Sequence, residues 1–166
     1  LAEKINPYLR PLYDALHDDK TRAVLTAPTD TGSGGYTHKF FKAARSREEM
    51  IAQRDAIAAW ARITYGWMGR SPDYKAAFLN TLGVNAEFYG KFADNARAWH
   101  RRAQEAVLYL NHALVNPPID RSKPVEDVKD VYVSIQKETD AGIYVSGAKV
   151  VATNSAMVRT KYLATL

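Results

Sequence analysis

Residues 109–120 of the chain read YLNHALVNPPID, and the character of the sequence changes at this stretch. Upstream, apolar residues recur three and four positions apart from about Asn85 to about Val115, a spacing that predicts a long amphipathic helix. Pro117 and Pro118 end the pattern, because proline lacks a backbone donor and disfavours helical dihedrals in the residue before it. Downstream, the pattern is that of short strands.

Two further helices are predicted before this one. Ser46 and Glu49 stand at capping-box spacing, ahead of a single apolar stripe that extends to Met68. A second start signal follows directly, with Ser71 as the N-cap of a shorter helix that closes at Gly83.

The last third of the chain predicts strands in hairpin order. Apolar and polar residues alternate over residues 131–135, a turn precedes Gly142, and two more short strands cover residues 143–146 and 149–153. A helical part followed by antiparallel strands predicts an α+β fold.

The bulk composition is that of a globular protein. The 166 residues are 46% hydrophobic and 25% charged, with no apolar run long enough for a membrane span and no signal-peptide core. Zero cysteines exclude disulfides, cysteine zinc sites and thiolate nucleophiles. We expect a cytoplasmic protein without a membrane partner or a metal site.

The net charge of +5 raises the question of a nucleic-acid partner. The densest basic cluster holds Arg97, His100, Arg101 and Arg102, and it carries no zinc-finger or RNP-like motif. A solvated helix face is the favoured interpretation, so we expect no nucleic-acid binding. The glycine-rich stretch 30–35 lacks the Gly-Lys-Ser/Thr ending of a phosphate loop and is expected to be a flexible loop.

Four residues, at three places in the sequence, could carry chemistry. His112 lies near the predicted C-terminal end of the long helix, where the helix dipole favours a cation that could hold an anionic oxygen. Arg70 and Tyr74 flank the start of the short helix, and both could donate to one ligand. Thr153 ends a predicted strand among small polar residues. The alternatives stay open: a histidine that caps its own helix, a surface arginine beside a half-buried tyrosine, and a plain turn.

Four long runs, taken in order, resemble the flavin-using oxygenase component of the 4-hydroxyphenylacetate 3-monooxygenase family. They extend from about Leu12 to Ala156 and are far more specific than any short motif. The runs are TDTGSGGYTHKFF, QRDAIAAWARITYGWMGRSPDYKAAF, FYGKFADNARAWHRRAQEAVLYLNHALVNPPIDR and VKDVYVSIQKETDAGIYVSGAKVVATNSA.

The resemblance implies a fold similar to acyl-CoA dehydrogenases. Residues 1–118 would form the N-terminal helical domain, and residues 119–166 would begin the middle β-barrel domain, with the C-terminal helical bundle absent. The full-length form is expected to be a homo-oligomer, commonly a tetramer. Residues 157–166 depart from the family pattern.

The resemblance also implies the chemistry. A separate flavin reductase supplies FAD in reduced form as FADH2, O2 is the co-substrate, and a phenol such as 4-hydroxyphenylacetate is hydroxylated ortho to its hydroxyl to give a catechol. Arg70, Tyr74 and His112 match positions that bind the phenol oxygen, where converging donors would stabilise the electron-rich phenolate. Thr153, with Asn116 and Pro117, matches the flavin side.

Two further expectations complete this interpretation. The chain by itself is expected to be inactive, because in this family much of the flavin site comes from regions that the 166 residues do not include. The alternative function is a non-catalytic helical interaction module derived from the same family.

Overall fold

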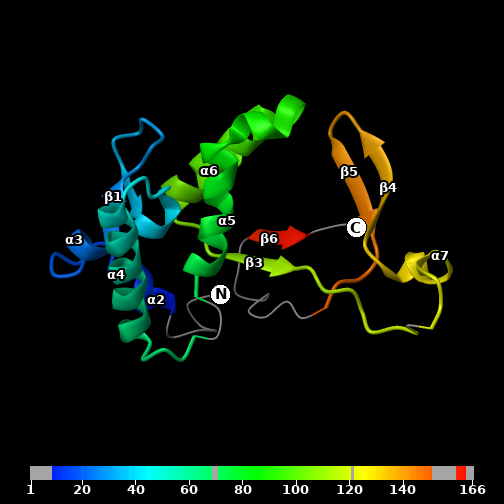
Figure 1. Cartoon of the computed structure of the whole chain (residues 1–166), viewed down its shortest axis with the longest axis horizontal. Helices are drawn as coiled ribbons and strands as arrows, with labels where there is room; N and C mark the ends of the chain where they lie inside the picture. The colour runs from blue at the N-terminus through cyan, green and yellow to red at the C-terminus, as the bar shows by residue number, and fades with distance from the viewer. Residues whose placement is uncertain (1–8, 69–70, 121, 151–159, 164–166) are drawn as a thin grey trace. The chain divides into compact units, whose positions relative to one another are not determined.

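The computed structural model describes residues 9–68, 71–120, 122–150 and 160–163 (Figure 1). The chain divides into two compact units, and along the sequence the second begins at Asn111. In the part of the chain that the structure describes, no helix is both long enough and apolar enough to cross a bilayer.

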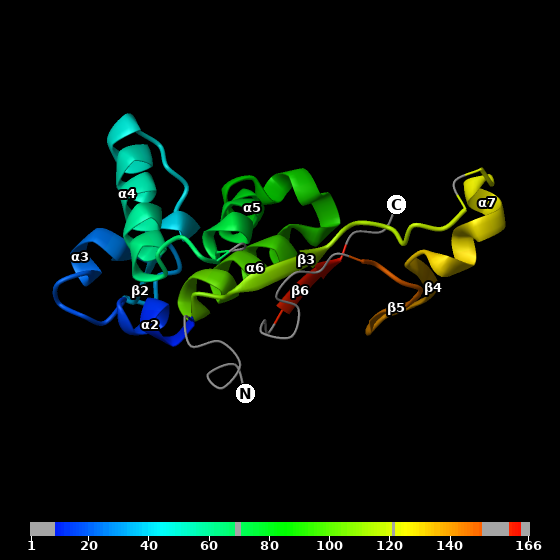
Figure 2. The ribbon, with the colours of Figure 1, turned by 90° about the horizontal axis from the view of Figure 1, so that it is seen from below.

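The first unit is mainly helical. Its elements in chain order are α2 (Leu9–Asp14), α3 (Arg22–Leu25), β1 (Thr26–Pro28), β2 (Tyr36–His38), η1 (Lys39–Phe41), α4 (Arg47–Ile63), α5 (Asp73–Val84), η2 (Ala86–Phe92) and α6 (Ala93–Ala106). β1 and β2 pair antiparallel, with Thr26 opposite His38. α5 packs along α6, as both views of the ribbon show (Figures 1 and 2).

One apolar core holds this unit together. Phe41 is fully buried and Trp60 is 3% exposed, and His38 is enclosed with them, its ring stacked 3.8 Å from that of Phe40. Each large apolar side chain that is buried in this way stabilises the fold by about 1.5–3 kcal/mol. The core joins both ends of the unit, because Leu12 and Leu110 belong to the same cluster.

The predicted start of α4 is confirmed. The Ser46 hydroxyl accepts the backbone N–H of Glu49 at 3.1 Å, which satisfies one of the free donors of the first turn. The Glu49 carboxylate turns back to the backbone N–H of Arg45 at 2.5 Å. The helix ends at Ile63, earlier than the predicted stripe to Met68, because Tyr65 adopts a left-handed conformation.

The prediction for α5 is accurate to about one residue. The helix begins at Asp73 rather than directly after Ser71, although the carbonyl of Ser71 accepts the backbone N–H of Tyr74 at 3.3 Å. Gly83 lies within the last turn, and the helix continues to Val84.

The predicted helix from Asn85 to Val115 is wrong in its first and last parts. Residues Ala86–Phe92 form the 3-10 segment η2, interrupted at Gly90 with φ of 52°, and α6 begins only at Ala93. α6 ends at Ala106, because Val107 adopts a left-handed conformation with φ of 43°. The N–H of Leu108 then donates to the carbonyl of Ala103 at 3.2 Å, as in a Schellman cap. Glycine usually fills the left-handed position, so this helix end had no visible signal in the sequence.

The second unit holds short strands and one helical turn. Its elements are β3 (Leu110–Ala113), which begins at the border of the units, α7 (Val125–Val128), η3 (Lys129–Val131), β4 (Ser134–Thr139), β5 (Gly142–Ser146) and β6 (Thr160–Leu163). β3 pairs with β6, and β4 forms an antiparallel hairpin with β5.

The strand predictions are confirmed for the hairpin and corrected at its start. β4 begins at Ser134, and Val131 ends a 3-10 turn instead of beginning a strand. Gly147 makes the predicted turn after β5, where a Cβ atom would stand 2.1 Å from the carbonyl oxygen of Tyr132. Val150 bridges antiparallel to Val115, Lys149 belongs to no strand, and residues 151–153 of the predicted strand 149–153 lie outside the described residues.

Candidate functional site

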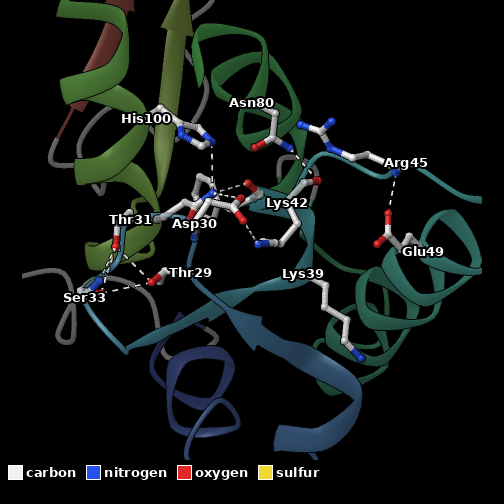
Figure 3. Close-up of polar contacts among 12 residues, drawn as sticks. Thr29, Asp30, Thr31, Ser33, Lys39, Lys42, Arg45, Glu49, Asn80 and His100 are labelled. Carbon is white, nitrogen blue, oxygen red and sulfur yellow. Dashed lines mark hydrogen bonds and ion pairs between the residues drawn. The ribbon is translucent and has the colours of Figure 1, made fainter. Parts of the chain in front are cut away.

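A polar cluster around one buried glutamine lies between the Gly-rich loop and α6 in the first unit (Figure 3). Gln104 is its centre and is fully buried. Its side-chain oxygen accepts the backbone N–H of Asp30 at 2.8 Å, and its amide nitrogen donates to the Asp30 carboxylate and to the carbonyl of Phe41, each at 3.1 Å. Lys42 also pairs with the Asp30 carboxylate. These contacts join residues that are 74 positions apart in the chain.

The cluster shifts the pKa of two of its members, Asp30 and His100. Burial by itself would raise the pKa of Asp30, but hydrogen bonds from Lys42 and Gln104 and the charge of Lys42 outweigh burial and lower this pKa. Burial lowers the pKa of His100, and the nearby Asp30 only partly opposes that shift. At neutral pH the cluster therefore holds an ionised Asp30 beside a neutral His100.

Hydroxyl groups organise the Gly-rich loop that carries Asp30. The hydroxyl of Thr31 lies within hydrogen-bond distance of those of Thr29 and Ser33, at 3.0 and 2.9 Å, and the N–H of Thr29 donates to the carbonyl of Gly35 at 3.0 Å. The sequence predicted a plain flexible loop here. The contact between Asp30 and Gln104 orders this loop, and the sequence alone gives no indication of that contact.

A cavity of about 430 Å³ opens beside this cluster. Gly83 permits close packing at its wall, because a Cβ atom there would lie 2.2 Å from Nδ1 of His100. The side chains that line the cavity are mostly charged, and among them are Asp30, Lys42, Arg45, Glu49, Arg97 and Arg101.

Of the two residues predicted at the start of α5, the structure describes Tyr74. Its side chain is 49% exposed, in the first turn of the helix. The ammonium of the buried Lys75 lies 4.9 Å from the Tyr74 ring centroid and 4.4 Å from that of Phe78. Arg70 lies outside the described residues.

His112 lies on strand β3 and not at a helix end, so the predicted helix-dipole effect on its imidazole is wrong. The reason is the early end of α6 at Ala106. The His112 side chain is half-buried, and its backbone N–H donates to the side-chain oxygen of Asn111 at 2.7 Å. Tyr74 belongs to the first compact unit and His112 to the second, so their convergence on one ligand stays a prediction.

Asn116, one of the two predicted residues of the proline stop, contacts a lysine that the sequence did not single out. Lys149 donates to the side-chain oxygen of Asn116 at 2.6 Å and to the carbonyl of Leu114 at 3.2 Å. The carbonyl of Pro117 accepts the N–H of Ile119 at 2.9 Å. Thr153, the third predicted flavin-side residue, lies outside the described residues.

The fold and the relatives of the chain define its class. A helical region followed by small antiparallel sheets recurs in a solved archaeal 4-hydroxybutyryl-CoA dehydratase, with a TM-score of 0.70 over 96% of this chain and 34% of that one. At 21% identity this likeness concerns the fold alone. The sequence model of the family described as "4-hydroxyphenylacetate 3-hydroxylase N terminal" matches residues 4–164, so the chain belongs to this family.

Individual relatives are similar over most of this chain. It is 64% identical over 152 residues to the 4-hydroxyphenylacetate 3-monooxygenase oxygenase component of Pseudomonas aeruginosa, covering 92% of this chain and 29% of that protein. It is 60% identical to the 4-nitrophenol 2-monooxygenase oxygenase component of a Rhodococcus species, with coverages of 92% and 30%. The chain therefore spans less than a third of the length of these relatives.

A solved structure agrees with these relatives. The oxygenase component of 4-hydroxyphenylacetate 3-monooxygenase, complexed with FAD and 4-hydroxyphenylacetate, matches with a TM-score of 0.78 and 34% identity. The match covers 86% of this chain and 30% of that one.

Proposed function

We propose that the chain forms the N-terminal part of the oxygenase component of a two-component flavin monooxygenase. The whole protein would hydroxylate a phenol ortho to its hydroxyl with O2 and reduced FAD, which a separate flavin reductase supplies. The observation that carries the proposal is the 63–65% identity to three proteins named 4-hydroxyphenylacetate 3-monooxygenase oxygenase component. A homo-oligomer, expected to be a tetramer, is part of the proposal.

The names of the relatives narrow the substrate class. They contain 4-hydroxyphenylacetate, 4-nitrophenol and a 3-chloro-4-hydroxyphenyl group on a carrier protein. Each is a phenol with a substituent opposite its hydroxyl. The proposed substrate is therefore a 4-substituted phenol, 4-hydroxyphenylacetate or a similar compound.

Arg70, Tyr74 and His112 are the proposed binding residues for the phenol oxygen. Arginine and tyrosine side chains are hydrogen-bond donors, and a neutral imidazole donates from one of its two nitrogens. Donors that converge on one oxygen favour the phenolate, and the phenolate directs electrophilic hydroxylation to the ortho carbon because its ring is richer in electrons. This role of His112 needs only its imidazole N–H and is independent of a helix dipole.

Asn116, Pro117 and Thr153 are the proposed flavin-side residues. Lysine can only donate, so the contact with Lys149 fixes the Asn116 side chain with its oxygen toward the ammonium. No described residue accepts a hydrogen bond from the Asn116 amide nitrogen, and this donor fits a carbonyl oxygen of an isoalloxazine ring. When bound, reduced FAD would activate O2 for transfer to the phenol.

The domain assignment is also part of the proposal. Residues 1–118 correspond to the helical domain and residues 119–166 to the first strands of a β-barrel domain. The antiparallel hairpin β4–β5 supports the assignment of residues 119–166, since barrels of this kind are built from such pairs.

A chimera provides the test. This chain would replace the aligned part of the P. aeruginosa relative, and catechol formation would be measured with a flavin reductase and 4-hydroxyphenylacetate. We expect an active chimera, in which Tyr74→Phe and His112→Ala each lower kcat by about 100-fold, as for the loss of one oxyanion donor. The absorption spectrum of the bound substrate should also lose its phenolate band.

The matched control is Tyr36→Phe, which removes a hydroxyl that bonds His17 in the first unit. Its kcat should equal that of the unsubstituted chimera. A folded chimera that binds no flavin after gel filtration would contradict the enzyme proposal and support the interaction module. Unchanged phenolate formation in His112→Ala would remove His112 from the site.

A further inference from the structure

The cavity beside Asp30 has an excess of positive charge that the proposed oxygenase function does not use. Four cationic side chains line it, namely Lys42, Arg45, Arg97 and Arg101, against the carboxylates of Asp30 and Glu49. His100 adds no charge at neutral pH, because burial lowers its pKa.

Two of the four cations already have partners. Lys42 pairs with Asp30, which also accepts from Gln104, so the Asp30 charge is compensated. Arg97 pairs with Glu87 and, at 2.8 Å, with Asp94. These pairs leave little attraction for a further anion at Lys42 or Arg97.

Arg45 and Arg101 differ from them. Among the residues that the structure describes, no carboxylate lies within ion-pair distance of either guanidinium group. Glu49, four residues after Arg45, directs its carboxylate to the backbone N–H of Arg45 at 2.5 Å. The cavity wall therefore presents two guanidinium groups with unused donors.

We propose that this cavity binds a phosphate group through Arg45 and Arg101. A guanidinium donates two parallel hydrogen bonds to phosphate oxygens, which makes arginine the preferred residue for this group. A volume of about 430 Å³ exceeds what phosphate alone needs and lies within the range of small-molecule pockets. The apolar side chain of Val84, 54% exposed, lines the same cavity and can contact the organic part of a phosphate ester.

The position of the cavity separates this ligand from the proposed phenol. Gly83 and Val84 are the last residues of α5, whereas Tyr74 lies in its first turn. At 1.5 Å per residue these positions are about 15 Å apart along the helix. A phosphate at Arg45 and Arg101 and a phenol at Tyr74 would not compete, and the phosphate proposal does not depend on the proposed function.

Calorimetric titration of the 166-residue chain tests the inference. The probes are inorganic phosphate, pyrophosphate and ADP, in a phosphate-free buffer with sodium chloride added to hold the ionic strength constant. We expect saturable binding, weakened about tenfold or more by Arg101→Gln and by Arg45→Gln, as each loses charge-assisted hydrogen bonds. ADP binding tighter than phosphate would identify an ester as the ligand, and equal binding would identify free phosphate.

The matched control is Arg47→Gln. It removes the same charge two residues from Arg45, at a position outside the cavity lining. Its dissociation constant should be unchanged, and amide NMR shifts on titration should be confined to the cavity, including Gly83. The inference is overturned if no probe binds at millimolar concentration, or if Arg47→Gln weakens binding as much as Arg101→Gln does.

Discussion

The first unit and the β4–β5 hairpin of the second unit bury their apolar residues to very different degrees. Leu25, Phe41 and Ala56 are completely buried in the first unit. In the hairpin, Ile143 is 58% exposed and Tyr144 is 61% exposed, and no residue of β5 is buried.

The difference shows that the first unit is stabilised by its own buried core, whereas the hairpin has none. The helical unit closes a core with side chains from its first helix to the start of β3. A two-stranded hairpin with both faces in water is marginal by itself, so β4–β5 depends on contacts beyond its two strands. Substitutions should therefore have large effects in one region and small effects in the other.

The largest effect is expected for Phe41→Ala. Removal of a fully buried phenyl ring leaves a cavity and should lower the free energy of unfolding by about 3–5 kcal/mol. The control Ile143→Ala, in the exposed hairpin, should change it by less than about 0.5 kcal/mol. Urea denaturation followed by tryptophan fluorescence measures the first unit, because all three tryptophans lie before Leu110. Equal effects of the two substitutions would contradict the comparison.

The next effect is a pH dependence that is confined to the first unit. Burial lowers the pKa of His38 from 6.5 to about 3. Below about pH 6.5 the unfolded chain binds a proton at this residue that the folded chain does not bind. The free energy of unfolding therefore decreases as the pH is lowered, by about 2 kcal/mol between pH 7.5 and pH 5. Urea titrations at both pH values should show this loss.

His38→Asn tests the source of that dependence. Nδ1 of His38 accepts the N–H of Phe40 at 3.2 Å, and an asparagine oxygen can accept in its place without titrating. The variant should lose most of the pH dependence. An unchanged slope would assign it to other groups.

A smaller effect on stability is expected at the hydrogen bond beside the C-terminal end of α6. The hydroxyl of Tyr13 donates to the carbonyl of Val107 at 2.9 Å. Tyr13→Phe should destabilise the first unit by about 1–2 kcal/mol, because the carbonyl loses its partner in a partly buried place. Tyr36→Phe, whose hydroxyl lies in an exposed contact with His17, should cost less than about 0.5 kcal/mol. Equal values would mean that the bond to Val107 has no special role.

The smallest effect is expected at the wall of the cavity. Gly83→Ala gains about 1 kcal/mol in helix propensity but forces the His100 ring to move, so a net loss of about 1 kcal/mol is expected. In a His100→Ala background the same substitution should become stabilising. A double-mutant cycle with urea denaturation measures the coupling free energy between residues 83 and 100. Additive effects of the two substitutions would show that a side chain at position 83 does not clash with His100.

The fold could be predicted where local signals agree with packing. Ser46 and Glu49 mark the start of α4, and Gly142 and Gly147 mark the turns of the hairpin, so these elements were found from sequence alone. The end of α6 was missed because Val107 occupies a position that normally requires glycine, and distant contacts hold it there.

The candidate sites also differ in whether the sequence points to them. Family resemblance proposes Tyr74, His112 and Asn116, whose roles stay predictions, and the strand geometry of His112 depends on the unpredicted helix end. The cluster around Gln104 was invisible, because a polar residue on a charged helix face gives no sign of complete burial. Its partner Asp30 is 74 residues away, and no periodicity links the two.

The bond from Tyr13 to Val107 also bears on how the protein is made. Domains form progressively as the chain leaves the ribosome, N-terminal residues first. Tyr13 therefore emerges well before Val107 is translated, and the hydroxyl that binds the Val107 carbonyl is already present when α6 forms. The hydrogen bond beside the end of α6 therefore joins a residue that is synthesised early to one that is synthesised about ninety residues later.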